Sequence, residues 1–281
     1  MTAARIRYFG WSGRAVEWGG EALMFDPFWR RYCGAQWFGP ETFARAGVVC
    51  LTHGHEEQFL DAPEILRRTG AAAVGSPSLC ACLRWVERAP RERLVALRTG
   101  DEAAIGAFRI STFPWKHRDI KLCKALSKAV FQGNATQLSW AFSSATRAPF
   151  YSPYTGFHVA LPDGTTVLNY NEGFNSKMTQ AEIDALGRRF RTDVLLAGMQ
   201  LDFVEDVARG AAALKPKVVL LYKPHEHFHA MMGATSAPWR AFVAAVERAV
   251  PGARVIEALP GLAIDAHTGS ELEAPVEMRA A

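Results

Sequence analysis

Histidine is the residue type whose distribution along this chain points most directly to chemistry. Five of the eight histidines fall in two short clusters, His53/His55 and His225/His227/His229. His53 and His55 directly follow a short apolar run at 48–51, which is typical of a buried strand. Side chains at positions i and i+2 of an extended turn can converge on one ion, and imidazole is a common ligand of zinc, iron and manganese. Since Glu57 adds a carboxylate nearby, the pattern predicts a metal site where this strand ends.

A second chemically suggestive segment is basic. The segment 116–128 has a surplus of four positive charges, which equals the formal net charge of +4 of the whole chain. Its cations are Lys116, Arg118, Lys121, Lys124 and Lys128, set against Asp119. Apolar residues recur there at helical spacing, so we predict an amphipathic lid at 116–155 inserted into the fold. Cations such as Lys116 and Arg118 suit an anionic substrate, and a solvated helix face is the alternative interpretation.

The elements that must position these residues are short strands alternating with helices. We expect strands at 5–9, 15–18, 22–25, 48–51, 72–74, 93–97, 103–105, 108–113, 157–161, 166–168, 193–197, 218–222, 254–257 and 263–264. We expect helices at 62–69, 78–88, 179–189, 203–214 and 238–250. The alternation in both halves predicts one α/β domain over 1–281 with an internal pseudo-repeat, and a loosely ordered tail after His267.

The composition excludes several classes of protein. Of the 281 residues, 49% are hydrophobic and 21% are charged, as in ordinary globular proteins. No apolar run approaches the roughly 20 residues of a membrane helix, and the first residues show no secretory signal, so we expect no stable membrane anchor and a cytoplasmic location. The net charge is too small to indicate nucleic-acid binding.

In the order of its motifs, the chain resembles the metallo-β-lactamase superfamily. Within it, the resemblance is to lactonases and phosphodiesterases related to ascorbate-6-phosphate lactonase. The motifs in order are Phe25-Asp26-Pro27, Leu51-Thr52-His53-Gly54-His55, Thr99-Gly100-Asp101, His117, Asn169-Tyr170-Asn171-Glu172-Gly173, Pro224-His225 and Leu259-Pro260-Gly261. The resemblance implies a four-layer αββα sandwich whose site takes ligands from both halves.

The same resemblance implies roles for individual residues. His53, His55 and His117 would bind the first metal ion, and His225 the second. The bridging carboxylate falls on Glu172, with Asn169 or Asn171 as alternatives, and Asp26 would orient a ligand without binding metal. Further candidates for substrate contact are Tyr170, His227 and His229.

The chain departs from the family pattern H-x-H-x-D-H, because it reads His53-Gly54-His55-Glu56-Glu57-Gln58. Glu57 replaces the aspartate of the motif and is our candidate for orienting or deprotonating a water molecule. Gln58 is the second catalytic candidate. It replaces the last histidine of the motif with a neutral, weakly basic amide. The outcome is a single-metal site, a two-metal site rebuilt with Glu57 and the 225–229 histidines, or a lost site. Longer carboxylates and fewer nitrogens favour iron or manganese over zinc.

These observations lead to three functional hypotheses. The first is a hydrolase with one or two divalent ions (Zn, Fe or Mn) that cleaves a small anionic ester, lactone or phosphodiester through a metal-bound hydroxide. The second is a di-iron or di-manganese oxidoreductase on the same fold, and the third is a catalytically inactive, metal-free binding protein. Self-association into a homo-oligomer is compatible with all three.

Overall fold

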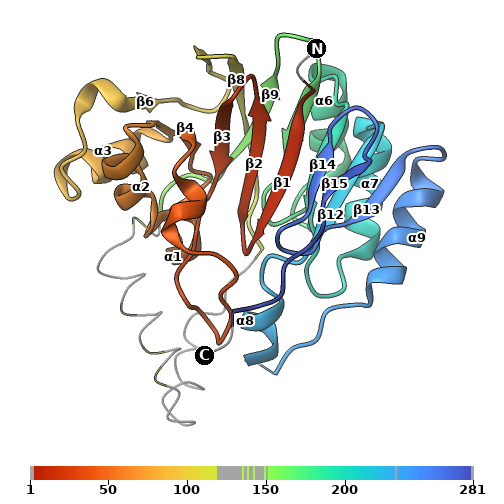
Figure 1. Ribbon diagram of the computed structural model, residues 1–281. Coiled ribbons are helices and arrows are strands. Elements are labelled where there is room, and N and C mark those ends of the chain that lie inside the picture. Colours follow the sequence, from red (N-terminus) through yellow and green to blue (C-terminus); the bar gives the residue numbers. More distant parts are fainter. Residues whose placement is uncertain are drawn as a thin grey trace.

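The computed structural model describes residues 3–118, 151–231 and 233–279, together with positions 135, 138, 142 and 149. Most of the predicted lid at 116–155 lies outside the described residues, including Lys121, Lys124 and Lys128 of the basic segment. Within the described part of the chain, the strands form two sheets with helices on their outer faces (Figure 1).

The first sheet has the spatial order β15-β14-β1-β2-β3-β4-β5-β6. Its strands are β1 (Arg5–Gly10), β2 (Gly13–Trp18), β3 (Glu21–Phe25), β4 (Ala46–Cys50), β5 (Ala72–Gly75), β6 (Leu94–Ala96), β14 (Ala263–Asp265) and β15 (Glu271–Glu273). The pairs β1–β2 and β2–β3 are antiparallel, whereas β3, β4, β5 and β6 run parallel to one another.

The second sheet has the order β13-β12-β11-β10-β9-β8-β7. Its strands are β7 (Glu102–Ile105), β8 (Phe108–Pro114), β9 (Thr155–Ala160), β10 (Thr166–Asn169), β11 (Val194–Gly198), β12 (Val218–Tyr222) and β13 (Arg254–Glu257). Strands β10 to β13 are mutually parallel, and β8 shares their direction because β9 is antiparallel to both β8 and β10. The loops after β8, β10, β11 and β12 therefore emerge at one edge of this sheet.

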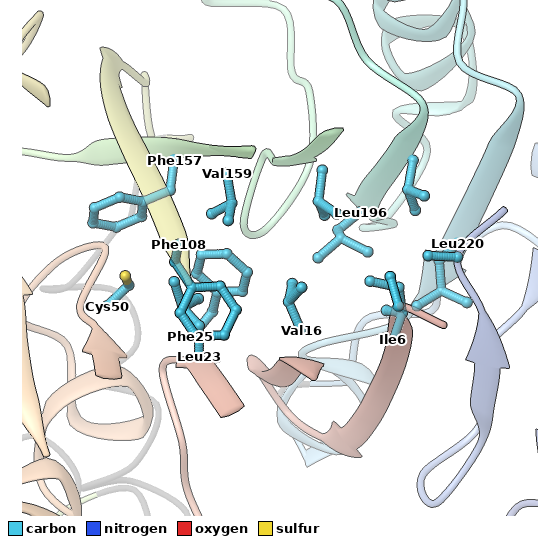
Figure 2. Packing of buried hydrophobic residues seen from close by; sticks show 14 of the residues in the cluster. Ile6, Val16, Leu23, Phe25, Cys50, Phe108, Phe157, Val159, Leu196 and Leu220 are labelled. Atoms are coloured by element: carbon cyan, nitrogen blue, oxygen red, sulfur yellow. The ribbon is translucent and has the colours of Figure 1, made fainter. Parts of the chain in front are cut away.

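A hydrophobic core lies between the two sheets. Figure 2 shows side chains of the first sheet, among them Val16 and Phe25, facing side chains of the second, among them Phe157 and Leu196. The rings of Phe25 and Phe157 lie 6.0 Å apart, centre to centre. Packing across this interface fixes the position of the strand ends of one sheet relative to the other.

Helices cover the outer faces of both sheets. They are α1 (Glu56–Phe59), α2 (Ala62–Thr69), α3 (Pro77–Trp85), α6 (Gln180–Arg189), α7 (Val204–Leu214), α8 (Glu226–Met231) and α9 (Trp239–Ala249), with short 3-10 turns η1 (Pro40–Phe43) and η2 (Arg91–Arg93). Helices α2 and α3 pack on the first sheet, and α6, α7 and α9 pack on the second (Figure 1). Leu195 and Leu196 of β11 explain this layering, because Leu196 faces the core between the sheets and Leu195 faces the helices. The result is the predicted αββα sandwich.

Three elements differ from the sequence-based expectations. Helix α8, which begins at Glu226, was not predicted, and the tail after His267 is not wholly loose, because β15 pairs with β14. The loop after β4 continues into the short helix α1, which places Glu57 and Gln58 on its first turns. None of the described helices is both long and apolar enough to cross a membrane.

Candidate metal centre

Four loops that follow strand ends carry the predicted metal ligands. His53 and His55 follow β4, His117 follows β8, Glu172 follows β10 and His225 follows β12. All five side chains are buried. The first of these strands belongs to one sheet and the other three to the second, so the cluster forms only where the edges of the two sheets meet.

Glu172 lies at the centre of this cluster. Its Oε2 atom lies 2.9 Å from Nε2 of His117, and its Oε1 atom lies 3.3 Å from Nε2 of His53. Oε1 also lies 3.2 Å from Nε2 of His225. One carboxylate thus contacts imidazoles from three separate loops, which is the position that the sequence analysis assigned to the bridging ligand.

The ligand atoms form two overlapping groups that could each hold a metal ion. In the first group, one atom from each of His53, His55, His117 and Glu172 lies within 4.8 Å of the others. In the second group the same holds for Glu57, Glu172 and His225. Glu57 contributes from α1, where its Oε1 atom lies 3.7 Å from Nδ1 of His225. Glu172 belongs to both groups.

The arrangement of hydrogen-bond acceptors in the first group fits a cation. The Thr52 hydroxyl donates its proton to Asp26 Oδ2 at 2.8 Å, so it accepts from Nδ1 of His53 at 2.9 Å. His53 Nε2 then carries a lone pair, which faces the acceptor Oε1 of Glu172 at 3.3 Å. Acceptor atoms that face one another in a buried space are stabilised by a cation among them.

The second group also has an acceptor that a cation could satisfy. Among the described residues, no donor contacts the buried Oε2 atom of Glu57. Imidazole nitrogens and carboxylate oxygens together suit zinc, iron or manganese. The donor atoms of both groups are therefore suited to bind a divalent metal ion.

Burial and mutual contact shift the pKa values of these groups. Burial lowers the pKa of His53 to about 4 and places that of His55 well below its ordinary value, so both rings are neutral, as metal ligands must be. Burial also lowers the pKa of His117, but the adjacent Glu172 carboxylate outweighs this effect and raises it overall. Burial alone would raise the pKa of Glu172, yet His117 and His225 hold it well below its ordinary value.

Asp26 acts on the cluster through Thr52. Its two carboxylate oxygens accept hydrogen bonds from the Thr52 backbone N–H and the Thr52 hydroxyl, both at 2.8 Å. The same hydroxyl accepts a hydrogen bond from His53, so Asp26 orients the His53 ring through Thr52. This agrees with the prediction that Asp26 orients a ligand without binding metal. The Arg14 guanidinium lies 3.4 Å from Asp26, and both side chains are fully buried. Burial nevertheless raises the pKa of Asp26 to about 7.

The backbone around Glu172 depends on the glycine that follows it. Gly173 has a φ of +100°, and a Cβ atom there would lie 1.8 Å from the carbonyl oxygen of Gly198. Only glycine fits this close approach between the loop after β10 and the end of β11. The chain can therefore turn directly after Glu172 and place this carboxylate against the histidines.

Two other residues of that loop have structural contacts. The Asn171 side chain donates to the Thr52 hydroxyl at 2.5 Å, and the Asn169 side chain accepts from the Asn171 backbone N–H at 3.1 Å. The structure therefore places Glu172, and neither asparagine, at the centre of the cluster. Gln58 donates to Ser12 Oγ at 2.8 Å, and its side chain is fully buried.

Several predicted substrate-binding residues lie elsewhere. Tyr170 is buried in the hydrophobic cluster beneath the helices and stacks on Phe174 at 3.6 Å between ring centres, so it is not placed to contact substrate. Lys116 forms an ion pair with Glu182 at 2.6 Å, which directs its charge toward α6. His227 packs against Trp37, with ring centres 5.4 Å apart.

Arg118 and His229 do lie beside the cluster. His229 is one helical turn after His225 on α8, and the two ring centres are 6.0 Å apart. Nη2 of Arg118 lies 3.1 Å from Nε2 of His229. The Arg118 backbone carbonyl accepts a hydrogen bond from Nδ1 of His117 at 2.6 Å, which orients that imidazole.

Three residues of the site were not found from the sequence, namely Arg14, Thr52 and Gln200. Arg14 carries a recognisable signal, because it lies two residues before Val16 on β2 and so shares the face that forms the core between the sheets. A charged residue in that pattern needs a buried partner. For Gln200 and Thr52 the only signal is their position just after a buried strand.

Comparison with curated proteins finds related sequences over part of the chain, whereas no protein-family model matches it. A UPF0173 metal-dependent hydrolase from Methylocella silvestris is 31% identical over 107 residues, which cover 38% of this chain and 45% of the relative. A protein of the same description from Methylobacterium nodulans is 29% identical over 113 residues, again with 38% and 45% coverage. The chain thus spans slightly less than half the length of these relatives.

Solved structures match nearly the whole chain. Igni18, described as a novel metallo hydrolase from the archaeon Ignicoccus hospitalis, superposes with a TM-score of 0.66 at 21% identity, covering 93% of this chain and 97% of its own. The metallo-beta-lactamase fold protein YhfI from Bacillus subtilis has a TM-score of 0.58 at 10% identity, with 94% and 99% coverage. CmlA, a diiron beta-hydroxylase from Streptomyces venezuelae, has a TM-score of 0.65 at 13% identity, with 94% and 54% coverage.

The chain therefore has the metallo-β-lactamase fold, and the fold predicted from the sequence is confirmed. Its sequence is similar to that of UPF0173 metal-dependent hydrolases. The narrower resemblance to ascorbate-6-phosphate lactonase and related phosphodiesterases stays a prediction.

Proposed function

We propose that the chain is a metal-dependent hydrolase that cleaves a small anionic ester, lactone or phosphodiester. The observation that carries the proposal is the Glu172 carboxylate, which contacts His53, His117 and His225 from three different loops. The similarity to proteins described as metal-dependent hydrolases supports it. When bound, a divalent metal ion supplies Lewis acidity and lowers the pKa of a coordinated water molecule to about 7.

The chain's own residues would hold and orient the metal ions and the reacting groups. His53, His55, His117 and Glu172 would hold one ion, and Glu57, Glu172 and His225 a second. Where the second group holds no ion, Glu57 would instead serve as a base for a water proton, because burial raises its pKa. Arg118 supplies a cation beside the cluster, which suits an anionic group on the substrate.

Metal content and chelator sensitivity test the proposal together. Protein purified without chelator is expected to contain at least about one equivalent of zinc, iron or manganese by elemental analysis. It is expected to hydrolyse members of a panel of nitrophenyl phosphodiesters, carboxylate-bearing esters and lactones. Activity should disappear with a chelator and return with metal. A metal content below about a tenth of an equivalent would contradict the proposal.

Oxidation at a di-iron or di-manganese site is a second candidate function. The two carboxylates, Glu57 and Glu172, favour it because oxygen ligands suit iron and manganese. CmlA, a diiron beta-hydroxylase, shares the fold. Iron-dependent visible absorption together with dioxygen consumption would favour this function, whereas a colourless zinc protein that hydrolyses the panel would exclude it.

The third hypothesis, a metal-free binding protein, attributes the loss of metal to Gln58, and one substitution tests this idea. Gln58→His is expected to raise the metal content above that of the wild-type protein, because an imidazole nitrogen would then lie beside Glu57 in the second group. Elemental analysis and zinc titration measure this change. Gln58→Leu is the matched control, since it has similar size and no nitrogen, and it should leave the metal content unchanged. Equal metal content in Gln58→His and the wild-type protein would show that Gln58 does not limit the second group.

A further inference from the structure

The amide of Gln200 connects the cation beside the cluster to the carboxylate at its centre. Gln200 lies two residues after β11 and is 3% exposed. Its Nε2 atom donates to Oε2 of Glu172 at 2.9 Å and to the Glu172 backbone carbonyl at 3.0 Å. Its Oε1 atom accepts a hydrogen bond from Nε of Arg118 at 2.5 Å. Both ends of the amide are therefore occupied.

Arg118 fixes which way this amide points. A guanidinium carries only donors and a carboxylate only acceptors, so an amide between them has one favourable orientation. If the Gln200 amide were reversed, its NH2 group would face the donors of Arg118 and its oxygen would face Glu172. The observed orientation directs both N–H groups of Gln200 toward Glu172, where they hold the carboxylate and the backbone of the same residue.

The charge of Arg118 is not neutralised by an acidic partner in the part of the chain that the structure describes. Among the described residues, its guanidinium contacts Gln200 Oε1 and His229 Nε2, and both acceptors are neutral groups. Its guanidinium therefore acts on Glu172 through Gln200 by donating a hydrogen bond, while its net positive charge remains close to the cluster.

We propose that Gln200 and Arg118 are positioning residues that hold the Glu172 carboxylate in the orientation in which it would bind metal together with the histidines. Gln200 acts directly on Glu172, and Arg118 acts through Gln200. This proposal rests on the proposed function, because Glu172 has a metal to bind only if the cluster binds one.

A positioning role and a purely electrostatic role of Arg118 predict opposite changes in zinc affinity when this residue is replaced. A cation close to a metal site repels a divalent ion, so removal of its charge alone would strengthen metal binding. If Arg118 instead orients Gln200 and thereby Glu172, its removal weakens metal binding even though a repulsive charge is lost. The sign of the change in zinc affinity thus separates the two roles.

The experiment measures zinc affinity by competition with a chromophoric chelator in the wild-type protein, Gln200→Met, Arg118→Met, Arg118→Lys and the Gln200→Met/Arg118→Met double variant. Gln200→Met is expected to weaken zinc binding about 10- to 100-fold, as for other groups that orient metal ligands. Arg118→Met and Arg118→Lys should each weaken it several-fold. The double variant should bind zinc no more weakly than Gln200→Met alone, because Arg118 positions Glu172 through Gln200 and its remaining effect, charge repulsion, is also removed. Arg109→Met, an exposed cation paired with Glu102, is the control and should bind zinc as the wild type does.

A second readout follows the ligand geometry itself. The visible absorption spectrum of the cobalt-loaded protein is expected to change in Gln200→Met and in both Arg118 variants, and to stay constant in Arg109→Met. If Gln200→Met does not fold, as judged by circular dichroism, the half-buried Arg118 variants still decide the question. Unchanged or tighter zinc binding in Arg118→Met, or unchanged binding in a folded Gln200→Met, would overturn the proposal. If the wild-type protein binds no metal, the proposed function is contradicted as well. If the wild-type protein binds zinc and the Gln200 and Arg118 variants bind it equally well, only the positioning proposal is contradicted.

Discussion

The double variant His53→Ala/His55→Ala is expected to bind about one equivalent of metal less than the wild-type protein after purification without chelator, and to lose metal-dependent hydrolysis. These residues supply two of the four ligand atoms of the first group, and their nitrogens lie 2.9 Å apart. Without them, the first group keeps only His117 and Glu172. Two remaining protein ligands are too few for the four-coordinate sites that such ions occupy in proteins.

A matched control separates loss of ligands from loss of histidine in general. His267→Ala removes a histidine that bonds to Asp163 and Thr165 at the surface, and its metal content should equal that of the wild type. Because His53 and His55 are buried, the near-isosteric His53→Gln/His55→Gln variant guards against a cavity effect, and circular dichroism verifies the fold. If either folded double variant contained as much metal as the wild-type protein, these histidines would not be ligands.

Arg14→Met is expected to lower the free energy of unfolding by about 3–5 kcal/mol. Arg14 is fully buried and supplies the positive charge next to Asp26, and it also contacts the Tyr222 hydroxyl and the Asn171 carbonyl. Its replacement leaves a buried carboxylate without a counter-ion, which costs far more than a lost surface pair. Urea unfolding followed by circular dichroism measures the change.

Two further variants test this explanation. Arg14→Met/Asp26→Asn removes both charges and should recover at least about half of the lost stability, because no isolated charge remains. Arg5→Met disrupts a pair with Glu273 in which both side chains are over one-third exposed, and it should cost less than about 1 kcal/mol. A cost of Arg14→Met similar to that of Arg5→Met would show that the buried pair does not contribute in this way.

Local sequence patterns predicted most of the fold, because strands and helices here bury regular apolar faces. The predicted helix 62–69 and strand 218–222 coincide with α2 and β12. The short helices α1 and α8 were missed because four to six residues are too few for helical periodicity to show. Strand β15 was missed because all its side chains are exposed, so its pairing with β14 leaves no apolar pattern. The single-domain organisation over 1–281 stays a prediction.

The sequence predicted some residues of the site and missed or misplaced others. Motif order identified His53, His117, Glu172 and His225, which the structure brings together. Tyr170 was misplaced because the chain leaves β10 after Asn169 and turns before Glu172, where Asn171 has a φ of +39°, so the Tyr170 ring packs in the core while Glu172 faces the histidines. Gln200 could not be predicted, since its role depends on the approach of the loops after β8, β10 and β11, which are far apart in the sequence.

The placement of the ligands in loops after strand ends has an evolutionary consequence. Residues such as Glu57 and Gln58 lie beyond the hydrogen-bonded ladders of β4 and its neighbours, so they can change type without disturbing the pairing of either sheet. A descendant of such a protein can therefore lengthen a carboxylate, lose an imidazole or acquire a new donor while its scaffold stays the same. A difference such as Gln58, which stands where the motif of the resembling family has histidine, is one that this separation of scaffold from chemistry permits.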